Sequence, residues 1–98
     1  PQEEIEIIIQ EKNLQNKFKS IYGTPLSKTE IIRKILTENN YKKENVVFVG
    51  DAIADLEGAS NNDLNFIGRV PKGETSIFPE KTIIIDDLTS LNDLILNF

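Results

Sequence analysis

Two aspartates that directly follow a hydrophobic segment are the residues whose types and spacing most clearly suggest chemistry. The segment Val46–Gly50 ends in a glycine, and Asp51 and Asp55 come next, four positions apart. Four consecutive apolar residues predict a buried strand with both faces covered, as in a parallel sheet flanked by helices. Such sheets bind ligands beyond the carboxyl ends of their strands. Because carboxylate oxygens there suit Mg²⁺, we predict that Asp51 and Asp55 bind this metal.

Each aspartate also has an interpretation without a ligand. Asp51 fits an N-cap or an Asx-turn residue before a helix. Asp55 fits a first-turn acid that interacts with the helix dipole. The pair favours the metal interpretation, because two carboxylates in one site raise each other's pKa unless a cation lies between them.

Lys28 is the second residue whose position suggests chemistry. The segment Ser27–Glu30 fits a capping box, in which Ser27 is the N-cap of a helix and Glu30 returns to its amide. A lysine in the first helical turn opposes the positive end of the dipole. It is therefore either a solvated lysine that tolerates this cost or a cation that faces an anion such as phosphate together with the helix N-terminus. The acid pair Asp86–Asp87 resembles a helix entry rather than a second site.

Composition excludes several classes of function. The 98 residues allow one domain at most, and a net charge of −5 argues against nucleic acid or an anionic membrane as partner. Without Cys or His there is no thiolate nucleophile, no imidazole metal site and no Ser-His-Asp catalysis. No apolar run is long enough to span a membrane, so we expect a cytoplasmic protein. A chain that begins Pro-Gln-Glu-Glu without Met is expected to be a piece of something longer.

The hydrophobic pattern predicts an α/β domain with a mainly parallel sheet, since helices alternate with short strands. Helices are expected over residues 1–12, from Ser27 to Asn39, over 54–60 and over 90–97. Strands are expected over 20–22, 46–49, 65–69 and 82–85.

The segments that end in Lys28 and in Asp55 together resemble the haloacid dehalogenase superfamily of phosphatases. Gly23-Thr24-Pro25-Leu26-Ser27-Lys28 is similar to its third motif, and Gly50-Asp51-Ala52-Ile53-Ala54-Asp55 to its fourth. Residues 66–69 resemble the next strand of the phosphoglycolate-phosphatase-like branch, and residues 1–4 resemble the helix after the second motif. Nearly the whole chain is covered in the right order.

This resemblance implies a three-layer αβα Rossmann-like core, present over residues 1–98 as its C-terminal part with about four strands and four helices. It implies a Mg²⁺-dependent phosphomonoester hydrolase that forms an aspartyl-phosphate on an upstream Asp and acts on a small phosphorylated substrate. Lys28 would neutralise the nucleophile and the phosphoryl oxygens. Asp51 and Asp55 would hold Mg²⁺ directly or through water, in keeping with electrostatic stabilisation of phosphoryl transfer.

The sequence also departs from the family pattern. The first motif, Asp-x-Asp-Gly, is absent from the 98 residues, and so are a cap domain and the second-motif Ser or Thr, unless that residue preceded Pro1. The chain alone is therefore expected to be inactive. The first two strands of the family sheet would lie between 20–22 and 46–49, so we expect a gap in the sheet. Exposed edges would invite pairing with another chain, or the two flanking strands would pair directly.

Two other functions fit the same residues. One is a non-catalytic phosphate- or metal-binding module, receiver-like or degenerate. In a receiver, however, the lysine follows the acceptor aspartate, whereas Lys28 precedes Asp51. The other is an interaction fragment that complements a second chain and keeps the acids as vestiges.

Overall fold

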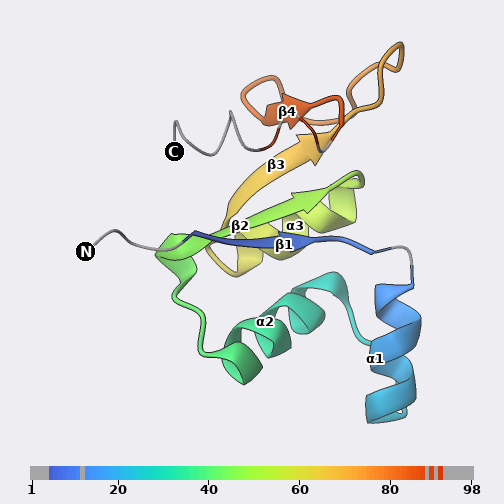
Figure 1. The fold of residues 1–98 in the computed structure, drawn as a ribbon. Coiled ribbons are helices and arrows are strands. Elements are labelled where there is room, and N and C mark those ends of the chain that lie inside the picture. The colour runs from blue at the N-terminus through green and yellow to red at the C-terminus, as the bar shows by residue number, and fades with distance from the viewer. Residues whose placement is uncertain (1–4, 12, 88, 90, 92–98) are drawn as a thin grey trace.

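In the part of the chain that the structure describes, four parallel strands form one sheet in the order β1-β2-β3-β4 (Figure 1). The structure is a computed structural model and describes residues 5–11, 13–87, 89 and 91. The strands are β1 (Glu6–Ile9), β2 (Val46–Gly50), β3 (Asn65–Arg69) and β4 (Ile83–Ile85). This arrangement confirms the predicted α/β class with a parallel sheet.

Within the described residues, three α-helices accompany the sheet: α1 (Leu14–Tyr22), α2 (Lys28–Asn39) and α3 (Ile53–Asn61). A short 3₁₀ turn, η1 (Lys43–Asn45), leads into β2. All five residues of β2 are buried, which fits its unbroken apolar sequence. Helices α2 and α3 pack on one face of the sheet around a core of buried side chains comprising Ile32, Leu36, Val46, Phe48, Ala59 and Leu64. On the other face Val47, Val49, Ile67 and Ile85 pack with Leu91.

Helix α2 begins as the sequence predicts. Ser27 is its N-cap, the Ser27 hydroxyl accepts from the Glu30 amide at 3.2 Å, and the Glu30 carboxylate accepts from the Ser27 amide at 3.2 Å. These hydrogen bonds with the Ser27 backbone and side chain lower the pKa of Glu30. The helix ends at Asn40, whose left-handed backbone (φ 55°) suits asparagine. The capping box therefore fixes where Lys28 enters the fold.

The predicted helix over residues 1–12 is wrong for its described part, because Glu6–Ile9 form β1. Ile7, Ile8 and Ile9 are β-branched, and three in succession favour an extended backbone. β1 pairs with β2 in parallel, with Glu6 opposite Val46 and Ile9 opposite Val49. The strand gains the backbone hydrogen bonds of the β2 edge, which a short isolated helix could not offer.

The predicted strand over 20–22 is also wrong, because these residues end helix α1. Leu14, Phe18 and Tyr22 recur every fourth residue, the spacing of one helix face. Leu14 and Phe18 are buried, and the Tyr22 ring stacks on Phe18 with centroids 5.9 Å apart. Gly23 then ends the helix with φ 79°.

The expected gap in the sheet is absent from the described residues, because β1 pairs directly with β2. Direct pairing was one of the expected arrangements, but the strand is 6–9 rather than 20–22. Both edges of the sheet keep exposed side chains: Ile7 and Ile9 on β1, and Ile83 and Ile84 on β4. The predicted helix over 90–97 lies outside the described residues except for Leu91. In the part that the structure describes, no helix is long and apolar enough to cross a membrane.

Candidate functional site

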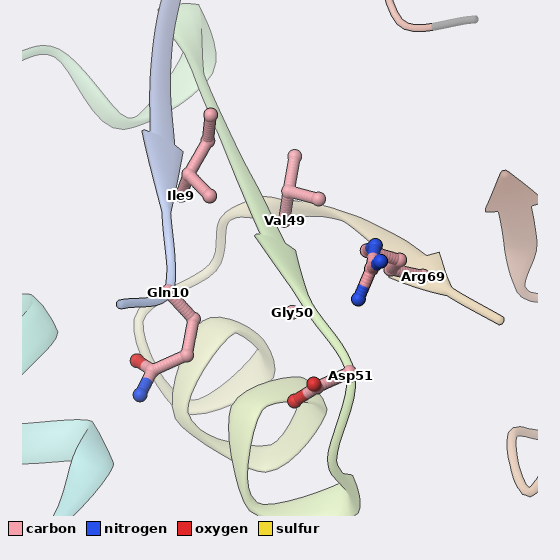
Figure 2. A pocket seen from close by; sticks show the side chains of 6 residues that line it. All are labelled: Ile9, Gln10, Val49, Gly50, Asp51 and Arg69. Carbon is pink, nitrogen blue, oxygen red and sulfur yellow. The ribbon is translucent and has the colours of Figure 1, made fainter. Parts of the chain in front are cut away.

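The carboxyl ends of β1, β2 and β3 meet around one pocket (Figure 2). Its volume is about 310 Å³, and it is lined by Ile9, Gln10, Val49, Gly50, Asp51 and Arg69. This is the edge of a parallel sheet at which α/β proteins bind their ligands. The volume lies at the lower end of the roughly 300–1,000 Å³ of small-molecule sites. The pocket therefore suits a small ligand.

Asp51 is the predicted acid that reaches this pocket. It directly follows β2, is exposed, and also lines a second hollow of about 180 Å³ beside Arg69. Among the described residues its carboxylate has no hydrogen-bond or ion-pair partner. Ala52, not Asp51, is the N-cap of α3. The Asp51 side chain is thus free to bind a cation, rather than being used to cap the helix.

Asp55 lies beneath the loop and is completely buried. Its Oδ2 accepts from the amides of Asp51 at 3.1 Å and Ala52 at 3.0 Å, and its Oδ1 pairs with Lys28 Nζ at 2.7 Å. Both carboxylate oxygens therefore already have strong partners. Asp55 lies in the first turn of α3, the position expected if it is a first-turn acid rather than a metal ligand. It also holds the loop that carries Asp51.

Gly50 makes this close approach of Asp55 to the strand end sterically possible. A Cβ atom at position 50 would lie 2.4 Å from the Asp55 Cβ and 2.6 Å from Oδ2. Any larger residue would push the Asp55 side chain off the loop amides. Glycine at position 50, the last residue of β2, is thus required for the packing of Asp55 against the strand end.

Lys28 reaches Asp55 because α2 and α3 pack closely. A Cβ at Gly58 of α3 would lie 3.2 Å from the Lys28 backbone carbonyl carbon and 3.2 Å from the Lys28 Cβ. The buried Asn62 side chain ties the helices together by donating to the carbonyls of Thr29 at 3.0 Å and Gly58 at 2.8 Å. The start of α2 is therefore held rigidly against α3. The Lys28 side chain is largely buried, with 15% of its surface exposed.

The three predicted site residues are only partly brought together at the pocket. Lys28 and Asp55 form an ion pair, and Asp55 holds the Asp51 loop, but of the three only Asp51 lines the pocket. Asp86, at the end of β4, accepts from the Asp87 amide at 2.8 Å, and Asp87 accepts from the Thr89 amide at 2.8 Å. The helix that the prediction places after this acid pair lies outside the described residues except for Leu91, so the helix-entry interpretation stays a prediction.

The side chains at the pocket offer a divalent cation only part of a binding site. No group of three or more acidic, His or Cys residues converges within the described residues. Mg²⁺, however, is commonly held by one or two carboxylates, with water and substrate phosphate completing its shell. The free carboxylate of Asp51 meets that need in part, whereas both Asp55 oxygens are occupied by hydrogen bonds.

Arg69 is a pocket residue that the sequence analysis missed. It is the last residue of β3 and lies beside the end of β2, because Gly50 pairs with Gly68. Figure 2 shows its guanidinium near the loop that carries Asp51, with the Gln10 side chain on the other side of Gly50. The sequence predicts a strand that ends at Arg69, but the pairing of this strand with β2 is visible only in the structure.

A comparison with known protein families found a match. A family model described as haloacid dehalogenase-like hydrolase matches residues 1–69, which include β1, β2, β3 and all three helices. No curated protein matches the chain. With more than half of its length matched and an α/β fold of the expected class, the chain belongs to the haloacid dehalogenase-like hydrolase family.

Proposed function

We propose that the chain supplies the metal-binding and phosphate-neutralising part of a Mg²⁺-dependent phosphomonoester hydrolase. The observation that carries this proposal is the linked set Lys28–Asp55–Asp51 at the carboxyl end of β2. It joins a cation at a helix start to a free carboxylate in a small pocket. Family membership supports hydrolase chemistry, and phosphate esters are the substrates that such a charge arrangement suits.

The two aspartates would have different roles. Asp51 would bind Mg²⁺, because its carboxylate is exposed and has no partner among the described residues. Asp55 would act as a positioning residue, because both of its oxygens are already hydrogen-bonded. Bound Mg²⁺ would neutralise charge on the phosphoryl oxygens.

Lys28 would supply a second positive charge. Its ammonium has three hydrogen-bond donors, of which Asp55 takes one. The other donors would be available to a phosphoryl oxygen. Asp55 also prevents the side chain from turning away, so the charge would be in place before the substrate arrives.

The nucleophile would come from outside these residues. An aspartyl-phosphate needs an aspartate placed as in Asp-x-Asp-Gly, and the sequence has no such motif. We therefore propose that the chain forms the C-terminal part of the catalytic domain and does not turn over phosphate esters alone. Hydrolysis of p-nitrophenyl phosphate by the pure chain in the presence of Mg²⁺ would contradict this proposal.

A magnesium titration followed by amide NMR tests the metal role. We expect saturable, millimolar Mg²⁺-dependent shifts that centre on residues 50–52 and disappear in Asp51→Asn. Asp63→Asn is the matched control, because Asp63 is an exposed acid beyond the other end of α3 with a left-handed backbone (φ 59°) that asparagine accepts. Shifts that survive in Asp51→Asn would refute the metal assignment. No Mg²⁺-dependent shift at all would favour a vestigial site in a complementing fragment.

A further inference from the structure

Arg69 is the cationic side chain that lines the pocket at the carboxyl end of the sheet. Lys28 does not line it, and within the described residues the Arg69 guanidinium has no hydrogen-bond or ion-pair partner. Asp51 and Arg69 line the same two hollows without pairing. The guanidinium is therefore available to a ligand in the pocket.

We propose that Arg69 is a substrate-binding residue that holds an oxyanion of the ligand in this pocket. A guanidinium presents a planar fork of donors that matches two oxygens of a phosphate or a carboxylate. Ile9 and Val49 supply an apolar wall, and the volume of about 310 Å³ limits the ligand to a small molecule. The ligand class that fits the pocket is therefore a small organic oxyanion. The phosphomonoester of the proposed function is the first candidate within this class.

The charge of the Asp51 carboxylate makes binding of the oxyanion depend on a cation. It lines the same pocket as Arg69 and would repel a second anion unless a cation neutralises it. Binding of the oxyanion should therefore strengthen when Mg²⁺ is present. The expected effect of Mg²⁺ rests on the proposed function, whereas the binding of an oxyanion to Arg69 does not.

The test is a titration of the full 98-residue chain with inorganic phosphate, followed by amide NMR, once with EDTA and once with MgCl₂. We expect shifts at residues 50–51 and 68–70, with tighter binding in MgCl₂. Arg69→Gln should weaken phosphate binding about tenfold, the effect of losing a charge-assisted pair at a partly exposed site. Arg69→Lys should lose part of the affinity, because it keeps the charge but not the fork.

Arg33→Gln is the matched control. Arg33 is the other arginine of the chain, is exposed on α2, and lines neither hollow next to Asp51. Its removal changes the net charge equally and should leave phosphate binding unchanged. Wild-type affinity in Arg69→Gln, or an equal loss in Arg33→Gln, would overturn the inference. The amide spectrum of each variant shows whether it is still folded.

The outcomes separate the two proposals and the two sources of the oxyanion. Magnesium shifts without Arg69-dependent phosphate binding would overturn this inference and leave the proposed function standing. Arg69-dependent phosphate binding in EDTA that Mg²⁺ does not strengthen would keep the subsite and count against the metal role of Asp51. A parallel titration with acetate distinguishes the ligand group: binding of phosphate alone assigns the subsite to a phosphoryl group, and binding of both assigns it to oxyanions in general.

Discussion

Replacing Asp55 with asparagine tests whether the buried carboxylate organises the site. Asparagine has nearly the same shape, so the substitution leaves no cavity. It removes the charge that faces Lys28 at 2.7 Å, and one oxygen remains where two had served Lys28 and the amides of Asp51 and Ala52. The NH₂ group must then face either an ammonium or two N–H donors. Every arrangement leaves a donor opposite a donor.

The expected cost follows from the burial of the pair. Removing one partner of a buried ion pair typically costs about 3–5 kcal/mol. Asp55 is completely buried, but Lys28 is 15% exposed and can turn toward water, so we expect the lower end, about 3 kcal/mol. The total stability of a 98-residue domain is of the order of 5–15 kcal/mol. The variant should therefore fold, with a Tm about 12–24 °C lower than that of the wild type.

Urea unfolding of a double-mutant cycle provides the assay. The cycle contains Asp55→Asn, Lys28→Met and the double variant, and Glu57→Gln serves as the control because Glu57 is exposed on the same helix. We expect a coupling energy of at least about 1 kcal/mol between positions 28 and 55, and a change within about 0.5 kcal/mol for the control. A cost below about 1 kcal/mol for Asp55→Asn, or additive effects in the cycle, would refute the reasoning.

Two further predictions concern the loop and the capping box. Gly50→Ala should destabilise the fold by about 1–3 kcal/mol and broaden the amide signals of residues 51–52, because its Cβ would lie 2.4 Å from the Asp55 Cβ. Unchanged urea midpoints and spectra would show that the loop can move aside. Glu30→Gln should flatten the acid side of the stability–pH curve. The pKa of Glu30 is lowered in the folded state by Ser27, so its contribution is present above the unfolded pKa of about 4.3 and is lost as the pH falls through the folded value. An identical acid slope in both proteins would contradict this.

The elements that could be predicted from sequence are those whose local signals agree with their surroundings. The run of apolar residues before Gly50 predicts a buried strand, whatever the position of that strand in the sheet. The capping box of Ser27 and Glu30 is a local interaction, so it predicts the start of α2 without tertiary information. Residues 6–9 differ, because isoleucines at positions 5, 8 and 9 suit a helix face, whereas the run 7–9 suits a strand. Pairing with the free edge of β2 favours the strand over the helix, and this tertiary contact cannot be read from the local sequence pattern.

The sequence predicted the positions of the two aspartates in the fold better than it predicted their contacts. The spacing of Asp51 and Asp55 placed both near the end of β2, as the structure confirms. It could not show that both Asp55 oxygens would face amides and Lys28, since this depends on how α2 packs against α3. Arg69 was missed because a single arginine at the end of a strand matches no motif. Only the pairing of β3 with β2 brings it to the pocket.

The placement of β1 at the sheet edge has a consequence for local unfolding. The elements β2, α3 and β3 follow one another directly in the sequence and form a unit with many local contacts. β1, in contrast, is separated from β2 in the sequence by α1, α2 and η1. Edge elements with exposed side chains open at lower free energy than the core, and Ile7 and Ile9 are both exposed. Opening of β1 would remove Ile9 and Gln10 from the pocket and leave the Asp51 loop, Asp55 and Lys28 in place. Hydrogen exchange of the β1 amides would thus report on the formation of the pocket wall, separately from the folding of the charged centre.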